Sequence, residues 1–186
     1  MDQKKTTLFK KGGFFLIHLF QKLSLSFLYS IMQKKQTFTV AEAQQKLEHY
    51  CSYQERCHKE VETKLKSLGM IPSTIDFIMS YLINENYLNE SRFAQSFARG
   101  KFRIKKWGKV RIKKELKARQ ISEYNIKLGM KEITDSEYKT TFWTLFEKRK
   151  DAVKGQEIHL QKKKILSYMV YRGWETQLIY EALNDL

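Results

Sequence analysis

One spacing of apolar residues occurs three times along the chain. In each set the members are 4, 5, 5, 4 and 3 residues apart, and the sets are offset by 51 and then 53 positions. The three sets are Val61, Leu65, Met70, Ile75, Met79 and Leu82; Ile112, Leu116, Ile121, Ile126, Met130 and Ile133; and Ile165, Met169, Trp174, Ile179, Leu183 and Leu186. Residues four apart share a helix face, so each set predicts two helices joined by a break. The breaks fall at Gly69, Gln120 and Gly173, and glycine is the residue expected just past a helix end.

A third amphipathic helix precedes each of these pairs. The lead helices are expected at Thr39–Cys51, Asn89–Lys105 and Ser136–Ala152. Several residues carry helix start signals: Thr39 and Glu42 form a capping box, Asn89 and Ser122 are N-cap residues, and Pro72 suits the first turn.

The apolar faces of these helices are expected to form the core. In the first lead helix the face comprises Ala43, Leu47, Tyr50 and Cys51, and in the second it comprises Phe93, Phe97 and Ile104. The methionines of the repeated pattern, Met79, Met130 and Met169, are interpreted as core residues rather than as a cofactor site.

The pattern predicts an all-α fold of three tandem three-helix repeats that form an elongated curved rod. The expected domains are an N-terminal extension at 1–36, outside the fold, and helical repeats at 37–88, 89–135 and 136–186. A three-helix unit of about fifty residues buries little surface alone, so neighbouring repeats should share contacts.

Residues 1–31 do not follow the pattern. They combine lysines with an apolar run at 14–17, but they lack a small-residue cleavage site and are interrupted by Gln21 and Lys22. We favour an upstream mis-start before Met32, with an amphipathic, membrane-interfacial extension as the alternative.

The charge of the chain is large and concentrated. The net charge is +15, and eleven Lys or Arg with a single acid, Glu115, lie between Arg99 and Arg119. Apolar residues such as Trp107 are threaded through this stretch. A basic, folded surface of this kind favours a polyanionic partner such as nucleic acid over a purely solvating role.

The candidate binding residues are ten of the eleven cations of this stretch, all but Arg119, together with its tryptophan. They are Arg99, Lys101, Arg103, Lys105, Lys106, Trp107, Lys109, Arg111, Lys113, Lys114 and Lys117. Lys109, Lys113 and Lys117 are spaced to form a ridge on one helix, which would contact phosphates without reading bases. The two basic helices would frame a groove where they meet, and Trp107 is expected mainly to pack. A secondary basic patch comprises Lys148, Arg149, Lys150, Lys162, Lys163 and Lys164.

Motifs for catalysis or cofactor binding are missing from the sequence. There is no glycine-rich phosphate loop, no zinc-type Cys/His spacing and no histidine with an evident carboxylate partner. We therefore expect no enzyme activity, no cofactor and no small-molecule substrate. Cys51 and Cys57, if on one helix, lie on different faces and are expected to be ordinary reduced thiols of a cytoplasmic protein.

Three segments resemble the RecX family of regulatory proteins. The stretch at 86–122 contains Glu90, Arg92, Phe93 and Ala94, then Trp107, Gly108 and Lys109, then Ile112, Leu116 and Ile121. An opening segment with Arg56, Glu60, Val61, Leu65 and Gly69, and a closing segment at 165–183, are similar to the other two repeats of that family. Two departures are Asn89-Glu90, where the family often has an acidic pair, and Gln120 in place of glycine.

This resemblance implies a non-enzymatic modulator of the RecA recombinase. Such proteins bind the RecA–single-stranded DNA filament and mainly inhibit its ATPase, strand-exchange and co-protease activities, in DNA repair, recombination and the SOS response. The expected partners are therefore the RecA filament and single-stranded DNA, with no membrane, and the chain is expected to be a monomer. The alternative is a general nucleic-acid-binding helical-repeat protein without a specific protein partner.

Overall fold

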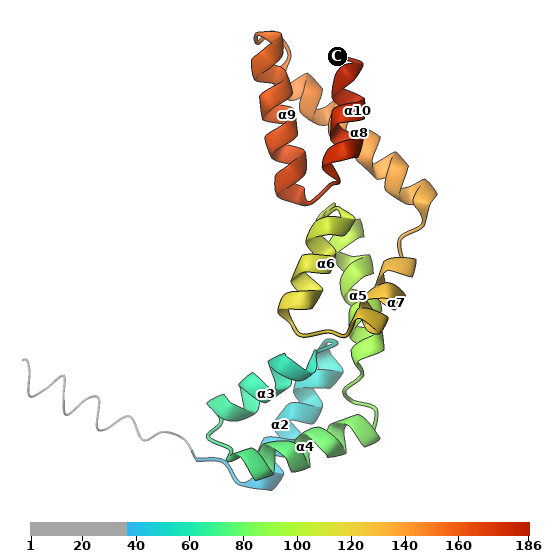
Figure 1. The fold of residues 1–186 in the computed structure, drawn as a ribbon. Helices are drawn as coiled ribbons and strands as arrows, with labels where there is room; N and C mark the ends of the chain where they lie inside the picture. Colours follow the sequence, from blue (N-terminus) through green and yellow to red (C-terminus); the bar gives the residue numbers. More distant parts are fainter. Residues whose placement is uncertain (1–36) are drawn as a thin grey trace, which may run out of the picture. The chain divides into compact units, whose positions relative to one another are not determined.

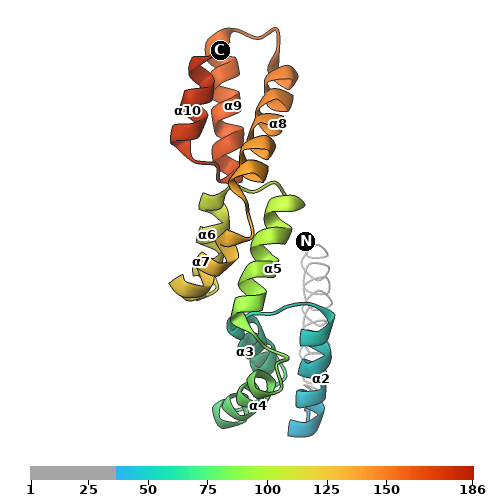
Figure 2. The same cartoon turned by 90° about the vertical axis from the view of Figure 1, so that its right-hand side faces the viewer.

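The computed structural model describes residues 37–186, and this part of the chain contains nine helices and no strand (Figures 1 and 2). The predicted all-α class and the three tandem three-helix repeats are confirmed. The expectations for residues 1–36 lie outside the described part of the chain.

The first repeat consists of α2 (Val40–Tyr53), α3 (His58–Ser67) and α4 (Pro72–Asn84). The expected capping box starts α2: the Thr39 hydroxyl accepts from the Glu42 backbone N–H, and the Glu42 carboxylate accepts from the Thr39 N–H at 2.8 Å. Pro72 occupies the first turn of α4, where its missing N–H costs no helical hydrogen bond.

The second repeat consists of α5 (Glu90–Arg103), α6 (Lys109–Ala118) and α7 (Glu123–Lys131). Asn89 caps α5 by accepting from the Arg92 N–H at 3.0 Å, and Ser122 caps α7. The helices α5 and α7 pack closely because Gly129 has no side chain: a Cβ there would lie 2.7 Å from the Ala94 carbonyl oxygen.

The third repeat consists of α8 (Asp135–Val153), α9 (Ile158–Arg172) and α10 (Thr176–Asn184). The helix α8 begins one residue before the expected start, because Thr134 serves as its N-cap and accepts from the Glu137 N–H. Gly173 ends α9 with a left-handed φ of 83°, as expected for a glycine at that break.

The buried side chains form two clusters. One belongs to the first repeat and includes Leu47, Val61 and Leu82. The other runs through the second and third repeats, from Phe93 to Leu183, and also takes in Cys57. The second and third repeats therefore share one continuous core, while the first repeat has a core largely of its own.

The predicted core residues are confirmed with one exception. Met169 is fully buried, and Met79 and Met130 pack against the two clusters. Ile104 was expected to be buried on the face of Phe93 and Phe97, and its burial was wrong: its side chain is 77% exposed. As the C-cap of α5 it keeps helical backbone angles and lines the same pocket as Phe93 and Phe97, but this end of the helix face is left open to solvent.

Candidate nucleic-acid interface

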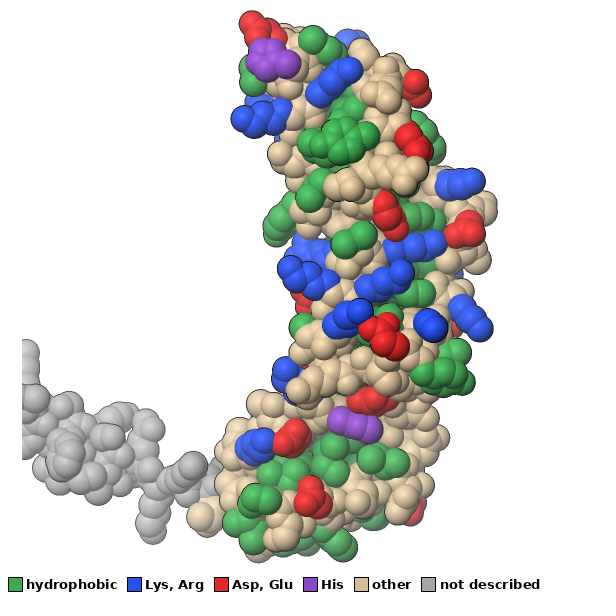
Figure 3. All heavy atoms as spheres, in the orientation of Figure 1, with side chains coloured by type: hydrophobic (Ala, Val, Ile, Leu, Met, Phe, Trp, Pro, Cys, Tyr) green, Lys and Arg blue, Asp and Glu red, His purple; other side chains and the backbone are tan. Residues whose placement is uncertain are grey.

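The basic residues are concentrated in the second repeat. Residues 89–135 contain fourteen Lys or Arg against five Asp or Glu, whereas residues 37–88 contain five against seven. Figure 3 shows Lys and Arg side chains gathered over the middle of the described unit, where the second repeat lies. The repeats thus differ in charge although they share one architecture.

Two of the predicted cations on α5 are engaged by acids of the following helices. Arg99 and Arg103 are four residues apart and so lie on one face of α5. Arg99 pairs with Glu132 at 3.0 Å, and Arg103 pairs with Glu137 at 3.2 Å. These ion pairs join α5 to the end of α7 and the start of α8, which gives both arginines a structural role.

The lysine ridge on α6 is similarly engaged at both ends. Lys109 pairs with Asp135 at 3.0 Å and lies over the Tyr138 ring, and Lys117 pairs with Glu123 at 2.6 Å. The pKa of the Asp135 carboxyl is lowered, chiefly by the hydrogen bond from Lys109. Lys113, in the middle of the ridge, is exposed.

Trp107 lies in the turn between α5 and α6 and is partly buried against the shared core, which agrees with the expected packing role. Two cations converge on its indole ring. The Lys101 ammonium is 5.2 Å from the ring centroid, and the Arg111 guanidinium carbon is 4.1 Å from it. Trp107 therefore holds two of the predicted cations in place by cation–π contacts.

Four of the predicted cations remain exposed and have no side-chain partner within residues 37–186. They are Lys105, Lys106, Lys113 and Lys114. The first two follow the end of α5, and the other two lie in the middle of α6. Because an ammonium without a partner carries its charge fully into solvent, these four lysines are best able to attract a polyanion.

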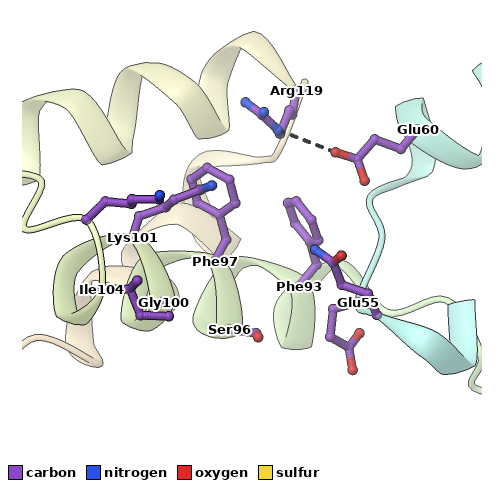
Figure 4. Close-up of a pocket in the computed structure, with 11 residues that line it drawn as sticks. Glu55, Glu60, Phe93, Ser96, Phe97, Gly100, Lys101, Ile104 and Arg119 are labelled. Carbon is purple, nitrogen blue, oxygen red and sulfur yellow. Dashed lines mark ion pairs between the residues drawn. The ribbon is translucent and has the colours of Figure 1, made fainter.

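A pocket of about 330 Å³ lies between the first and second repeats (Figure 4). Phe97 projects from α5 into it, with the Lys101 ammonium 5.2 Å and the Arg119 guanidinium carbon 4.9 Å from its ring centroid. Arg119 also pairs with Glu60 of α3 at 3.6 Å. The acids Glu55 and Glu60 line the same pocket, so its charge is mixed and it does not favour an anion.

The secondary basic patch lies on α8 and α9, which pack together in the third repeat. Lys150 pairs with Glu147 at 3.3 Å, and Arg149 lies over the Tyr168 ring at 5.3 Å. Lys148, Lys163 and Lys164 are exposed, and Lys162 is partly buried. This patch is sparser than the one on the second repeat.

The joint between the second and third repeats is built from backbone contacts. The Gly108 N–H donates to the Arg172 carbonyl at 2.9 Å, and the Val110 N–H donates to the Gly173 carbonyl at 3.1 Å. A Cβ on Gly108 would lie 2.1 Å from the Gly173 oxygen, so only glycine permits this approach.

Tyr138 completes this joint and was not predicted from the sequence. Its hydroxyl accepts from the Lys109 N–H at 3.0 Å and donates to the Glu175 carboxylate. Burial and the Glu175 hydrogen bond raise the pKa of Tyr138, so the phenol stays protonated and keeps donating. No local pattern could have identified this role, because Tyr138 and its partners are about 30 or more residues apart.

The joint between the first and second repeats is more polar. Arg92 pairs with Glu55, and His58 lies 3.3 Å from Glu90. Lys59 donates to the Ala118 carbonyl at 2.9 Å.

The expectation that no histidine has a carboxylate partner was wrong for His58, whose partner Glu90 is remote in sequence. It was also wrong for His159, whose Nδ1 lies 3.3 Å from the Glu157 carboxylate.

The two cysteines do not share a helix. Cys51 lies in α2, and Cys57 is the N-cap of α3. Both are buried free thiols, and burial raises the pKa of Cys51 to about 11.

Among residues 37–186, no cluster of three His, Cys, Asp or Glu side chains has a metal-binding arrangement. No helix in the same range is long and apolar enough to cross a bilayer.

Comparison with known proteins points to one family. The sequence model of the RecX second three-helix domain matches residues 89–130, which covers most of the basic repeat. The regulatory protein RecX of Prosthecochloris aestuarii is 28% identical over 137 residues, which cover 74% of this chain and 88% of that protein. RecX of Clostridioides difficile is 29% identical over 148 residues, which cover 77% of this chain and 68% of that protein.

The RecX protein of Bacillus cytotoxicus is 25% identical over 137 residues, and that match spans only 51% of its length. The chain therefore corresponds to about half of this longer relative.

Solved structures agree with the sequence matches. The crystal structure of RecX from Lactobacillus salivarius superposes with a TM-score of 0.67 at 25% identity, over 79% of this chain and 97% of that one. A second RecX crystal structure, at 20% identity, has the same TM-score and supports the fold. The chain is thus similar to RecX regulatory proteins in the sequence of its basic repeat, over most of its length and in its fold.

Proposed function

We propose that this chain binds the filament that the RecA recombinase forms on single-stranded DNA, and that it lowers the ATPase, strand-exchange and co-protease activities of the filament. The proposal rests on the second repeat. It is the repeat that the family model matches, and it holds four exposed lysines without a side-chain partner in the described part of the chain. A rigid, positively charged surface suits a nucleoprotein partner with a repeating phosphate backbone.

The proposed binding surface comprises Lys105, Lys106, Lys113 and Lys114, with Lys101 and Arg111 held against Trp107. The surface does not include Arg99, Arg103, Lys109 and Lys117, because each is paired with an acid of a neighbouring segment. The chain would act by occupying the filament, and its homologues are named as regulatory proteins rather than as enzymes.

The experiment is a charge reversal confined to lysines without a structural partner. The variant carries Lys105→Glu, Lys113→Glu and Lys114→Glu. Lys109 and Arg111 are left intact because Lys109 pairs with Asp135 and Arg111 donates to the Tyr171 carbonyl, so replacing them would disturb the joint with the third repeat. Inhibition of RecA ATPase on single-stranded DNA should require about tenfold more of this variant than of the wild type.

The matched control carries Lys127→Glu, Lys131→Glu and Lys139→Glu, which change the net charge equally at exposed positions outside the candidate set. It should inhibit within about twofold of the wild type, because screening at physiological salt limits the reach of distant charges to roughly 8 Å. If both variants lost RecA inhibition equally, only the net charge of the protein would matter. Unchanged inhibition by the first variant would refute the proposed surface.

A second candidate function is nucleic-acid binding without a protein partner. Lysines around an aromatic ring suit any single strand, so the same surface supports it. This function predicts that the protein inhibits RecA only at concentrations that already coat bare DNA.

A further inference from the structure

A groove of about 320 Å³ lies where α6 of the second repeat meets the end of α9 in the third. It is lined by Val110, Arg111, Lys114, Glu115, Val170, Tyr171 and Gly173. Gly173, which lines the groove, is also where the backbones of the two repeats approach closely at Gly108. The groove thus belongs to the joint whose hydrogen bonds fix the two repeats together.

Tyr171 is the unusual residue of this groove. It follows the buried stripe of Ile165 and Met169 along α9, but its own side chain is 74% exposed. Exposing so large an aromatic ring forgoes the burial that would otherwise stabilise the fold. An aromatic residue that the core does not use is available for a partner.

The Tyr171 ring is nevertheless held in place. The Arg111 guanidinium carbon lies 4.9 Å from its ring centroid, and Arg111 Nη1 donates to the Tyr171 carbonyl oxygen at 2.9 Å. Arg111 is itself fixed by Trp107 on the second repeat. The ring is therefore oriented before any partner arrives, which reduces the entropy lost on binding.

The charge and polarity of the groove complement a nucleotide. Val110 and Val170 are apolar and exposed, and Arg111 and Lys114 supply positive charge at the same groove. The one acid of the lining, Glu115, is paired with Arg119 at 2.8 Å, so it does not oppose an anion strongly. An aromatic face beside cations is the arrangement by which proteins bind single strands, stacking bases and neutralising phosphates.

We propose that this groove is a base-stacking site for single-stranded nucleic acid, in which Tyr171 stacks on a nucleobase while Arg111 and Lys114 contact the neighbouring phosphates. This inference rests on the proposed function in one respect, namely that DNA is touched directly. It adds a preference for single strands, because the base faces of a duplex are already stacked on one another and cannot reach the ring.

The test compares Tyr171→Leu with Tyr180→Leu in the full-length chain. Tyr180 lies on α10, is 55% exposed and does not line the groove, so it is the matched control. Binding to a labelled oligothymidylate and to an abasic strand of equal length and charge is followed by fluorescence anisotropy. The wild type should bind the abasic strand about tenfold more weakly than oligothymidylate.

Tyr171→Leu should bind oligothymidylate about tenfold more weakly than the wild type and should bind the abasic strand equally well, so the difference between the two strands disappears. The salt dependence of binding should not change. Tyr171→Phe, which keeps the ring, and Tyr180→Leu should both behave as the wild type. A preserved preference for bases in Tyr171→Leu would overturn the proposal. Equal loss on both strands would also overturn it, because it would assign Tyr171 to the backbone or to the fold, and a thermal melt separates these two cases.

RecA ATPase inhibition by the same proteins separates this inference from the proposed function. Inhibition by the wild type with no preference for bases would refute the stacking site and leave the proposed function standing. Stacking on oligothymidylate without RecA inhibition would refute the proposed function and leave the stacking site standing. Lost inhibition by Tyr171→Leu with unchanged DNA binding would mean that the groove docks an acidic protein segment, which contradicts the proposal.

Discussion

At the scale of single residues, the break between the second and third helix of each repeat needs a left-handed backbone. Gly69 and Gly173 both have φ of 83°, and Gln120 occupies the equivalent position with φ of 63°. An L-residue pays a steric penalty of about 1–2 kcal/mol in this region, whereas glycine does not. The second repeat therefore keeps its fold with a residue that is locally unfavourable.

Replacing Gln120 by glycine should stabilise the protein by about 1 kcal/mol, because the relief of backbone strain exceeds the extra freedom of glycine in the unfolded chain. Urea unfolding followed by circular dichroism measures the change. Gln45→Gly is the control, since Gln45 is an exposed position inside α2, and it should destabilise by about 0.5–1 kcal/mol. A loss of stability in Gln120→Gly would mean that the glutamine side chain has an unrecognised contact.

Glu42 offers a prediction about pH. The hydrogen bond from the Thr39 backbone N–H lowers the pKa of Glu42 below the usual 4.5. A carboxyl with a lowered folded-state pKa contributes stability above its unfolded pKa and loses it as the pH falls through the folded value.

The stability difference between the wild type and Glu42→Gln should accordingly be present at pH 7 and shrink as the pH falls below about 4.5. Urea midpoints of the two proteins at several pH values give this difference directly. A difference that stays constant across that range would exclude an ionised Glu42 from the capping box.

At the scale of elements, the joint between the second and third repeats depends on the absence of a side chain at Gly108. The φ of Gly108 is −74°, so alanine meets no backbone strain there, but its Cβ would overlap the Gly173 carbonyl. Gly108→Ala should therefore destabilise the protein by about 1–3 kcal/mol, the usual effect of overpacking. Chemical unfolding measures this, and intrinsic tryptophan fluorescence reports the neighbouring Trp107 and Trp174.

Gly100→Ala is the matched control for that substitution. Gly100 lies inside α5, and a Cβ there would have no atom within 4 Å, so the change should stabilise by about 0.5–1 kcal/mol. If both alanine variants changed stability in the same direction, the close contact at Gly108 would not be the cause.

The helices themselves could be predicted from the sequence because their determinants are local. The spacing of Ile112 and Leu116 and the caps at Thr39, Asn89 and Ser122 act within one or two turns, and each lies where it was expected. The joints could not be predicted, because pairs such as Gly108 with Gly173 are far apart in the sequence and have no periodic signal.

At the scale of the whole described unit, the sequence predicted the location of the basic surface. It did not predict which of the cations are paired with acids and which have no side-chain partner within residues 37–186. The count of cations placed the surface on the second repeat. It could not distinguish Arg99, which pairs with Glu132, from Lys114, which is free of side-chain partners within residues 37–186. Tyr171, the residue of the proposed stacking site, was not singled out from the sequence. It lies off the buried stripe of α9, and its neighbours on α6 are remote in the sequence.

The second and third repeats share one buried core, and the proposed binding surface lies on the second repeat. Phe102 and Tyr138 pack in this core with Trp174, so the joint beside the proposed surface is aromatic. The first repeat joins through ion pairs such as Arg92 with Glu55, which are weaker constraints than a continuous core. The part of the molecule proposed to contact the filament thus packs around the larger of the two buried clusters.

We propose that the RecA filament, rather than bare DNA, is the target of this protein. The most direct test is a titration of RecA ATPase on single-stranded DNA, measured beside a curve for binding of the protein to the same DNA without RecA. We expect half-maximal inhibition at a protein concentration well below the one that coats bare DNA. Inhibition that appears only once the bare strand is coated would contradict the claim and leave competition for DNA as the mode of action.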